Sequence, residues 1–341
     1  MMKGRVTADD VAKKAGVSQS TVSRVLNNYP FIKEGTREKV LEAINELGFT
    51  RDEIARSLVE KKTRTIGLII GNISNPFFAE SAGVIISKAQ KEKYDVIIYN
   101  TNHDDYQLEK AISTLIGKRV DGILAAAVNR NNARVKQLYE NGFPIVLYNS
   151  RLDDSEVNSI SLDNKKGAML AVEHLAELGH KKIAYIAGPS KYLTVYERYV
   201  AYREALQKYG LSYDSELVFN EELTHDKVVA FTKRILSRPD RPSAIFAMSD
   251  EMALAVMDGV AGVGLKIPDD VSIIGFDNIN IAANSYIGLT TISQQKEKMA
   301  LLALDNLIQL IESDQKDMQP VHVIIEPELL IRRTTGVCKG S

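Results

Sequence analysis

From residue 65 onward, short apolar runs alternate with longer amphipathic stretches, and this alternation restricts the possible folds more than any other feature. The apolar runs IGLII, VIIY, GILAA, IVLY, IAYIA, AIFA and SIIGF begin at residues 66, 96, 122, 145, 183, 244 and 272. Helical periodicity occupies 78–93, 106–118, 132–141, 165–178, 197–209, 226–237 and 250–261. Continuous apolar strands joined by helices are typical of parallel sheets covered on both faces. The sequence therefore predicts an α/β body.

The alternation pauses once, between Asn149 and Asp163, and then resumes. Two sheets fit this pause better than one, and 341 residues are enough for two or three domains at roughly 150 residues each. We therefore expect two parallel-sheet lobes within residues 65–341. The first lobe should comprise about 65–162 plus 291–320, and the second about 163–290 plus 321–341.

Residues 1–50 follow another pattern, which predicts three short helices. Thr7, with an acid three residues later, forms a capping-box pattern at the start of the first helix, and Gly16 ends it. Ser18 is placed to cap the second helix, and the third runs from about Thr36 to a stop at glycine. The N-terminal part is therefore predicted to be a small all-α head.

Residues 51–64 should form a hinge helix and linker between the head and the body. The first half has room for about two helical turns, too few to be stable alone, and the second half is a polar tether. Such a segment suits folding that is coupled to binding.

Charge is distributed unevenly between these parts. Residues 1–64 contain 13 Lys/Arg and 9 Asp/Glu, whereas the remainder contains 30 and 35. A basic head before an acidic body suggests that only the head approaches a polyanion. The single cysteine, Cys338, fits a reducing compartment, and neither an export signal nor a run of membrane-spanning length is apparent. We therefore expect a cytoplasmic protein.

The second predicted helix, within VSQSTVSRVL, has two contrasting faces. Val22, Val25 and Leu26 share one face, and the opposite face is polar, formed by Gln19, Ser20, Ser23, Arg24 and Asn27. Gln and Arg side chains bond base edges in the major groove, while Ser, Thr and Asn suit phosphate oxygens. A short turn before this helix matches helix-turn-helix geometry. The alternative is a small bundle whose outer face is merely polar.

Several motifs resemble the LacI/GalR family of bacterial transcription regulators over almost the whole chain. They are VTADDVAKKAGVSQSTVSRVLNN, TREKVLEAINELGF, IARSL, IGLIIGNISNPFF, RVDGIL, SLDNKKGAMLAVEHLAELGHKKIAYIAGP, RYVAYREAL, RPSAIFAMSDEMALAVM, IPDDVSIIGFDN and LTTISQ. The resemblance implies a helix-turn-helix head, a hinge helix and a two-lobed body like that of periplasmic sugar-binding proteins.

The resemblance also implies roles for particular residues in the head and hinge. The base-reading positions correspond to Gln19, Ser20 and Arg24, and Leu58 corresponds to a leucine that enters the minor groove at the operator centre. The backbone-contacting positions correspond to Thr7, Ser18, Thr21, Ser23 and Asn27. Lys33 and Gly35 depart from the family pattern, which leaves the cap of the third helix in question.

Ligands of parallel α/β sheets bind beyond the carboxyl ends of the strands, which directs attention to the residues that follow the apolar runs. These residues are Phe77, Phe78, Asn149, Ser249, Asp250 and Asp277. In the family, residues matching Arg198 and Asp277 contact the ligand, commonly a sugar or purine. The resemblance also points to Asn149, Asp163, Ser249 and Gln294. Each has a structural alternative: Phe78 as core, Asp163 as a helix cap, Arg198 as a surface residue.

Catalytic and metal-binding patterns are not apparent. The five histidines, His103, His174, His180, His225 and His322, lack metal-ligand spacing, and neither GVAGVG nor IGKR lies in a phosphate-loop context. We expect no enzyme, cofactor or metal.

The predicted function is a sugar-responsive repressor of carbohydrate-utilisation genes, a homodimer on a pseudo-palindromic operator. The alternatives are a purine or phosphoprotein corepressor, or a transport-type sugar-binding protein.

Overall fold

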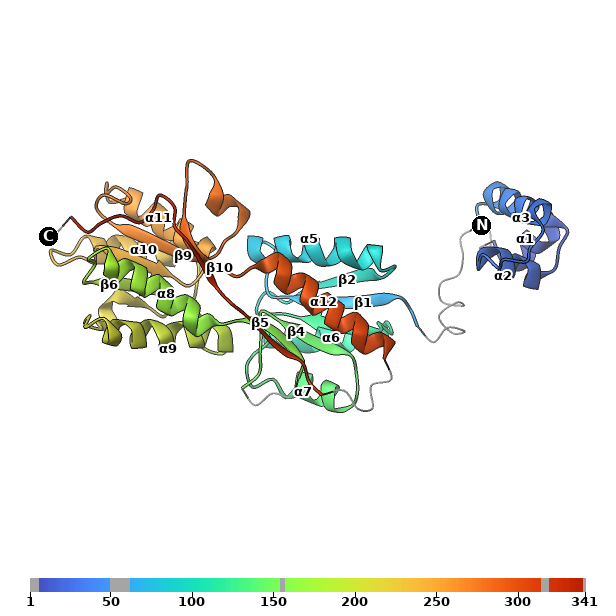
Figure 1. The fold of residues 1–341 in the computed structure, drawn as a ribbon, viewed down its shortest axis with the longest axis horizontal. Helices are drawn as coiled ribbons and strands as arrows, with labels where there is room; N and C mark the ends of the chain where they lie inside the picture. The colour runs from blue at the N-terminus through green and yellow to red at the C-terminus, as the bar shows by residue number, and fades with distance from the viewer. Residues whose placement is uncertain (1–5, 50–61, 154–156, 314–318, 340–341) are drawn as a thin grey trace. The chain divides into compact units, whose positions relative to one another are not determined.

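The computed structural model describes residues 6–49, 62–153, 157–313 and 319–339. The chain divides into two compact units, Met1–Thr63 and Arg64–Ser341. The first unit is a small helical head and the second is a two-lobed α/β body (Figure 1). The predicted fold class is therefore confirmed.

The head contains α1 (Ala8–Ala15), α2 (Gln19–Leu26) and α3 (Glu34–Leu47), packed around a small apolar core. The core residues that are fully buried are Val11, Ala12, Val22, Val25, Val40 and Ala43. Each helix contributes two of them, so each depends on the others for its stability.

Local hydrogen bonds set the limits of these helices. Thr7 and Asp10 form the predicted capping box, and Gly16 ends α1 at φ 67°, in the left-handed conformation that glycine adopts without strain. Ser18 caps α2 by accepting a hydrogen bond from the amide of Thr21. The third helix begins at Glu34, earlier than expected, and Lys33 at its N-cap makes no side-chain capping bond.

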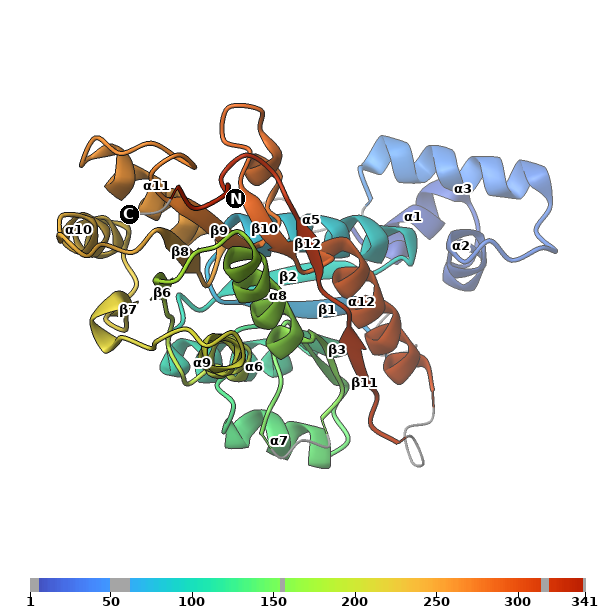
Figure 2. The same ribbon diagram turned by 60° about the vertical axis from the view of Figure 1, so that its left-hand side comes forward.

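The first sheet of the body has the strand order β11-β5-β4-β3-β1-β2, and all neighbours are parallel. Its strands are β1 (Thr65–Ile70), β2 (Asp95–Asn100), β3 (Gly122–Ala125), β4 (Ile145–Tyr148), β5 (Ser159–Leu162) and β11 (His322–Ile325). Two helices, α5 (Pro76–Lys91) and α12 (Lys296–Glu312), lie side by side on one face (Figure 2). The buried side chains of α6 (Asp105–Gly117) and α7 (Ala133–Glu140) pack in a separate cluster on the other face.

The second sheet has the order β12-β10-β9-β8-β6-β7, in which only β12 is antiparallel to its neighbour. Its strands are β6 (Ile183–Ile186), β7 (Val218–Phe219), β8 (Ala244–Ala247), β9 (Ser272–Asp277), β10 (Thr290–Ser293) and β12 (Glu328–Leu330). Helices α8 (Asn164–Glu177) and α9 (Leu193–Lys208) form one packed pair, and α10 (His225–Leu236) and α11 (Asp250–Ala261) form another. Two short 3-10 helices, η1 (Ser215–Leu217) and η2 (Asn280–Ala283), complete the regular elements described in this lobe.

The chain passes between the lobes three times: after β5, after β10 and after β11. This corrects the expected lobe limits, because β10 belongs to the second sheet although residue 291 was assigned to the first lobe. Likewise β11 belongs to the first sheet although residues from 321 were assigned to the second lobe. Both are four-residue strands without a crossover helix to their sheet neighbour, so the alternating pattern did not reveal them.

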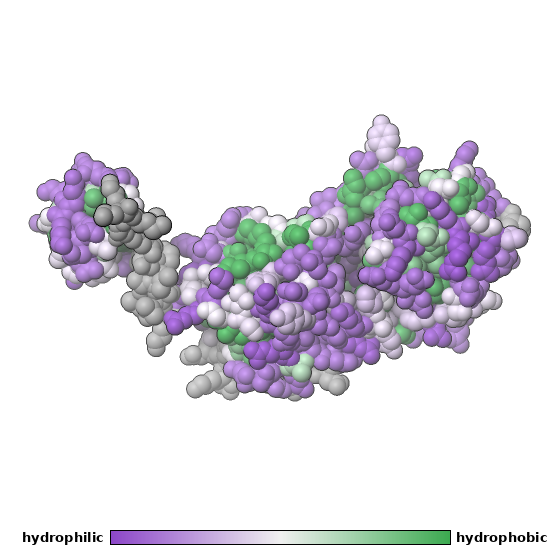
Figure 3. All heavy atoms as spheres, turned by 180° about the vertical axis from the view of Figure 1, so that it is seen from behind, coloured by the Kyte–Doolittle hydropathy of each residue, from purple (hydrophilic) through white to green (hydrophobic). Residues whose placement is uncertain are grey.

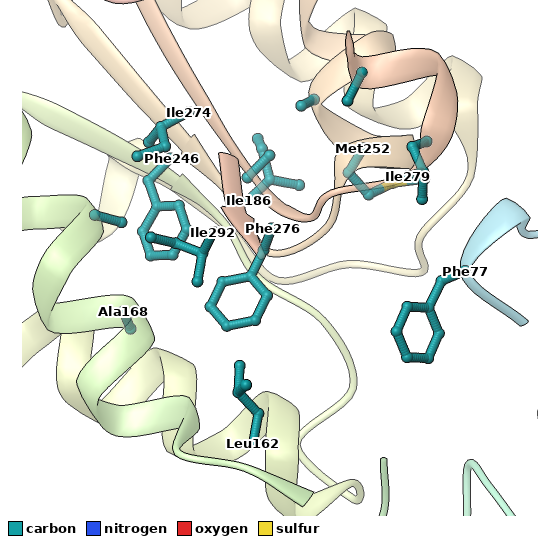
Figure 4. Close-up of a cluster of buried hydrophobic side chains, with 14 of the residues drawn as sticks. Phe77, Leu162, Ala168, Ile186, Phe246, Met252, Ile274, Phe276, Ile279 and Ile292 are labelled. Atoms are coloured by element: carbon teal, nitrogen blue, oxygen red, sulfur yellow. The ribbon is translucent and has the colours of Figure 1, made fainter. Parts of the chain in front are cut away.

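A continuous apolar cluster extends through both lobes. It includes Phe77 from α5, Leu162 at the end of β5 and Phe276 in β9, drawn together in Figure 4. The described helices include none that is both long enough and apolar enough to cross a membrane.

Candidate DNA-binding surface and ligand site

The exposed face of α2 has the polar composition expected from the sequence. Gln19, Ser20, Ser23, Arg24 and Asn27 are all exposed, whereas Val22 and Val25 are buried. The side chains of Ser18, Ser20 and Thr21 gather at the start of the helix, where the Ser18 hydroxyl lies 2.8 Å from both other hydroxyls. The face therefore presents hydrogen-bonding groups along its whole length.

The acidic residues of the head are absent from α2. Arg24 is the only charged residue of α2, and within residues 6–49 every acidic residue belongs to α1 or α3. A polyanion can therefore approach α2 without meeting a carboxylate on that helix. Thr7 has its hydroxyl and amide engaged by Asp10. Leu58 lies outside the described residues.

In the body, polar side chains from several strand ends and one helix converge. Arg198, on α9, is 3% exposed, which excludes the surface alternative. Its Nε donates to Oδ1 of Asn164 and its Nη1 to the carbonyl of Met248, both at 2.8 Å. Its guanidinium lies 3.7 Å from the centre of the Phe276 ring. Arg198 is therefore held rigidly, with its orientation fixed on three sides.

Asp277, the last residue of β9, is 4% exposed and accepts a hydrogen bond from Nε2 of Gln294. Burial, followed by the neighbouring charge of Asp250, raises the pKa of Asp277 to about 8, and the positive charge of Arg198 opposes this rise. Its φ of 134° is rare for a residue with a side chain and costs on the order of 1–3 kcal/mol. Strain and a displaced pKa together are typical of a functional position.

Two of the predicted site residues have a buried side-chain oxygen with no hydrogen-bond partner among the described residues. These oxygens are Oε1 of Gln294 and Oδ1 of Asn149, which follows β4. Burying an amide oxygen without a partner costs on the order of 1–3 kcal/mol. Both atoms therefore fit a site whose remaining partner comes from a bound molecule or water.

Three other predicted residues serve the lobe's own structure. Asp163 caps α8 through the amide of Lys166, and Ser249 caps α11 through the amide of Met252. The two oxygens of Asp250 accept from the Thr291 hydroxyl at 2.5 Å and the Ile279 amide at 2.9 Å. Asp163 therefore makes the contact of a helix cap, which is the alternative role expected for it from the sequence.

Aromatic rings form a chain across the two lobes. Phe77 and Phe78 pack edge to face at 5.5 Å, and Phe78 lies 6.1 Å from the ring of His103, which lies 5.6 Å from that of Tyr192. In Figure 4, Phe77 stands opposite Ile279 of the second lobe. His103 and Tyr192 were not among the predicted site residues. His103 follows the carboxyl end of β2, so the rule that selected the other candidates applies to it as well.

Burial and the charge of Lys191 lower the pKa of His103. The ring is therefore neutral near pH 7 and compatible with its aromatic neighbours. Among the described residues, no cluster of three or more His, Cys, Asp or Glu side chains is arranged to hold a metal ion.

Direct hydrogen bonds join the lobes at two places. Asn75 donates to Glu251 at 2.8 Å, and Arg151 pairs with Glu197 at 2.5 Å. The lobes are therefore closed onto each other, which accounts for the deep burial of the polar residues.

A helix-turn-helix head followed by two such lobes defines a class of proteins, the DNA-binding regulators with a ligand-binding body. The family model described as "Bacterial regulatory proteins, lacI family" matches residues 7–52, and that described as "Periplasmic binding protein-like domain" matches residues 172–335. Catabolite control protein A of Priestia megaterium is 34% identical over 93% of this chain and 96% of its own length. The HTH-type transcriptional repressor PurR of Aliivibrio salmonicida is 33% identical over 96% of this chain and 98% of its own length.

Solved structures of transcription regulators are also similar to this chain over most of its length. The Lac repressor dimer bound to operator and the anti-inducer ONPF has a TM-score of 0.85 at 27% identity, covering 97% of this chain and 99% of that one. The complex of the regulator CelR with cellobiose has a TM-score of 0.72 at 30% identity, covering 97% and 100%. The chain belongs to the LacI family of bacterial transcriptional regulators.

Proposed function

We propose that this protein is a sequence-specific repressor of carbohydrate-utilisation genes whose operator affinity is set by a sugar bound between the lobes. The observation that carries the proposal is the combination of an acid-free polar face on α2 with a buried Arg198–Asp277–Gln294 group in the body.

The operator-binding surface is proposed to be the exposed face of α2. Gln19, Ser20 and Arg24 read base edges, because amide and guanidinium groups bond these edges in pairs. Thr7, Ser18, Thr21, Ser23 and Asn27 contact the DNA backbone. The proposed domains are 1–50 for the head, 51–64 for the hinge carrying Leu58, and the remainder for the body.

The Arg24→Ala substitution tests this surface. Loss of one paired base contact should weaken binding to the selected operator about 10- to 100-fold, while binding to random duplex DNA changes little. Lys39→Ala, which removes one positive charge from α3, is the matched control. Equal losses on operator and random DNA would exclude a base-reading role for Arg24.

The effector is proposed to be a polyhydroxylated molecule. A carboxyl group, a guanidinium and amide oxygens without partners suit several hydroxyl groups, and aromatic rings such as Phe77 and Phe78 suit the apolar face of a sugar. The CelR–cellobiose complex supports a sugar in a relative. The name of the PurR relatives keeps purines as a second candidate.

A thermal-shift screen of the full-length protein against sugars, sugar phosphates and purines tests the effector class. Operator affinity is then measured with each hit. A sugar that stabilises the body and changes operator affinity supports the proposal, whereas a response confined to purines refutes the sugar assignment.

The operator-bound form is proposed to be a homodimer, since two heads suit a pseudo-palindromic site. Apolar patches interrupt the hydrophilic surface of the body (Figure 3). The body's large exposed apolar residues include Ile98 on the edge strand β2, Ile281 and Tyr286. Ligand binding would change the arrangement of the lobes and thereby the spacing of the heads.

A further inference from the structure

An aromatic pair stands exposed in the head, next to α2. Phe31 is 84% exposed and Tyr29 is 48% exposed, and their rings meet edge to face at 5.8 Å. Both lie in the connection between α2 and α3, outside the residues assigned to operator binding. Contact between the two rings leaves most of Phe31 in water, so the head's own packing does not explain its position.

The connection that carries the pair is firmly held. The amide of Tyr29 bonds the carbonyl of Arg24 at 2.9 Å. Arg37 of α3 donates to Oδ1 of Asn28 at 3.1 Å and to the carbonyl of Tyr29 at 3.3 Å. Ile32 packs against the core of the head, and Pro30 restricts the backbone between the rings. The aromatic pair is thus presented by a braced segment and is available to bind without a large ordering cost.

The pair continues the polar face of α2. The guanidinium of Arg24 lies 5.9 Å from the centre of the Tyr29 ring, and Arg24 is exposed on that face. A duplex that reaches Arg24 therefore comes close to Tyr29 and, through it, to Phe31. No other described aromatic ring is recorded in contact with Arg24.

The chemistry of duplex DNA limits what such a pair can recognise. Bases in a duplex are stacked on one another, so their faces are not available to aromatic side chains. Thymine alone among the four bases presents a methyl group on its major-groove edge, and phenylalanine is one of the residues that contact it. Deoxyribose is also apolar but carries no sequence information.

We propose that Tyr29 and Phe31 form an apolar reading site for the 5-methyl group of a thymine next to the base pair bound by Arg24. This inference rests on the proposed operator binding by α2 and adds a specificity element to it. Tyr29 supports both Arg24 and Phe31, and Phe31 makes the methyl contact.

The test uses full-length protein and an operator duplex selected by that protein from a random library. Each thymine is replaced by deoxyuridine, symmetrically in both half-sites, which removes only the methyl group. Affinity is measured by fluorescence anisotropy at one fixed salt concentration. One buried methyl group contributes about a fourfold change in affinity, so the sensitive position should lose about 15-fold over two half-sites.

The Phe31→Ala variant should lose a similar factor on the unmodified operator and show no further loss on the deoxyuridine duplex. Leu41→Ala is the control, since it also removes a half-exposed apolar side chain from the head but lies on α3. Leu41→Ala should still show the full loss of affinity that the missing methyl group causes. If Phe31→Ala and the unmodified protein lose the same factor in affinity at every replacement of thymine by deoxyuridine, the proposal is overturned.

A second measurement does not depend on the Phe31 variant. The operator base pair at which Arg24→Ala loses discrimination should neighbour the methyl-sensitive thymine, and a distant thymine, or none, overturns the proposal. Failure to select any sequence would instead refute operator binding itself. Specific binding with an unchanged deoxyuridine profile refutes only the aromatic reading site.

Discussion

The segment that follows Asp277 is clamped by a charged pair on the other lobe, and neutralising that pair should loosen the closed arrangement. Glu80 on α5 and Lys296 on α12 lie 3.1 Å apart, with side chains 19% and 12% exposed. Glu80 accepts from the amide of Asn280 at 3.0 Å, and Lys296 donates to the carbonyl of Asn278 at 2.6 Å. The perturbation is Glu80→Gln, which keeps the shape of the side chain but removes its charge.

The expected magnitude follows from the burial of the clamp. Hydrogen bonds to charged groups contribute about 1.5–3 kcal/mol each, and the variant also leaves Lys296 without its charge partner in a mostly buried position. We expect a loss of about 2 kcal/mol from the closed arrangement, equivalent to about 30-fold in the opening equilibrium.

Hydrogen exchange of full-length protein, read at the Asn280 amide by mass spectrometry or NMR, measures this opening directly. Glu92→Gln is the matched control, because Glu92 forms an ion pair of similar length with Lys88 on the same helix but is 43% exposed. Its effect should be much smaller, because solvent screens an exposed ion pair. Combining Glu80→Gln with Lys296→Met should recover part of the protection, because no unpaired charge then remains. Exchange at Asn280 no faster in Glu80→Gln than in Glu92→Gln would refute the clamp.

Two further predictions concern the ligand site and the hinge. Because the pKa of Asp277 is raised to about 8 from its ordinary 3.8, the folded body binds an extra proton between these values. Its stability should then fall by up to about 1.4 kcal/mol per pH unit as pH rises from 5 to 8. Asp277→Asn should flatten this dependence in urea unfolding at several pH values and abolish the effector response while leaving operator binding intact. If the stability of Asp277→Asn falls equally steeply with pH, a group other than Asp277 binds the extra proton. Replacing Leu58 by Ala should reduce operator affinity and DNA bending, followed by gel mobility of circularly permuted fragments, without changing the thermal shift caused by the effector. Unchanged bending would exclude Leu58 as a wedge.

Sequence patterns predicted well those elements that follow the regular alternation of apolar strands and amphipathic helices. Strands such as β1 and β8 are continuous apolar runs followed by helices, and the capping box at Thr7 is a local motif that depends on few distant contacts. Strand β10 was missed because its sequence, TTIS, is not a continuous apolar run, and β11 was missed because its partner β5 comes from a distant part of the chain.

The ligand site was less accessible to sequence reasoning. The rule that ligands bind beyond the carboxyl ends of strands selected Asp277 and Asn149. Arg198 lies on a helix and was found only through family resemblance. The burial that raises the pKa of Asp277 and the contact between His103 and Tyr192 depend on how the lobes meet. Such effects arise from packing between segments that are separated in the sequence, which one local pattern does not encode.

The three passages between the lobes also have a consequence for synthesis on the ribosome. The first sheet receives β11, and one of its faces receives α12, from residues 296–325, near the end of the chain. A nascent chain can therefore fold its head early, while the first lobe lacks an edge strand and a covering helix until residues 296–325 have been synthesised. Ligand response should consequently appear only in chains that include residues 296–325, and a truncation before residue 296 would leave a head attached to a body that cannot close.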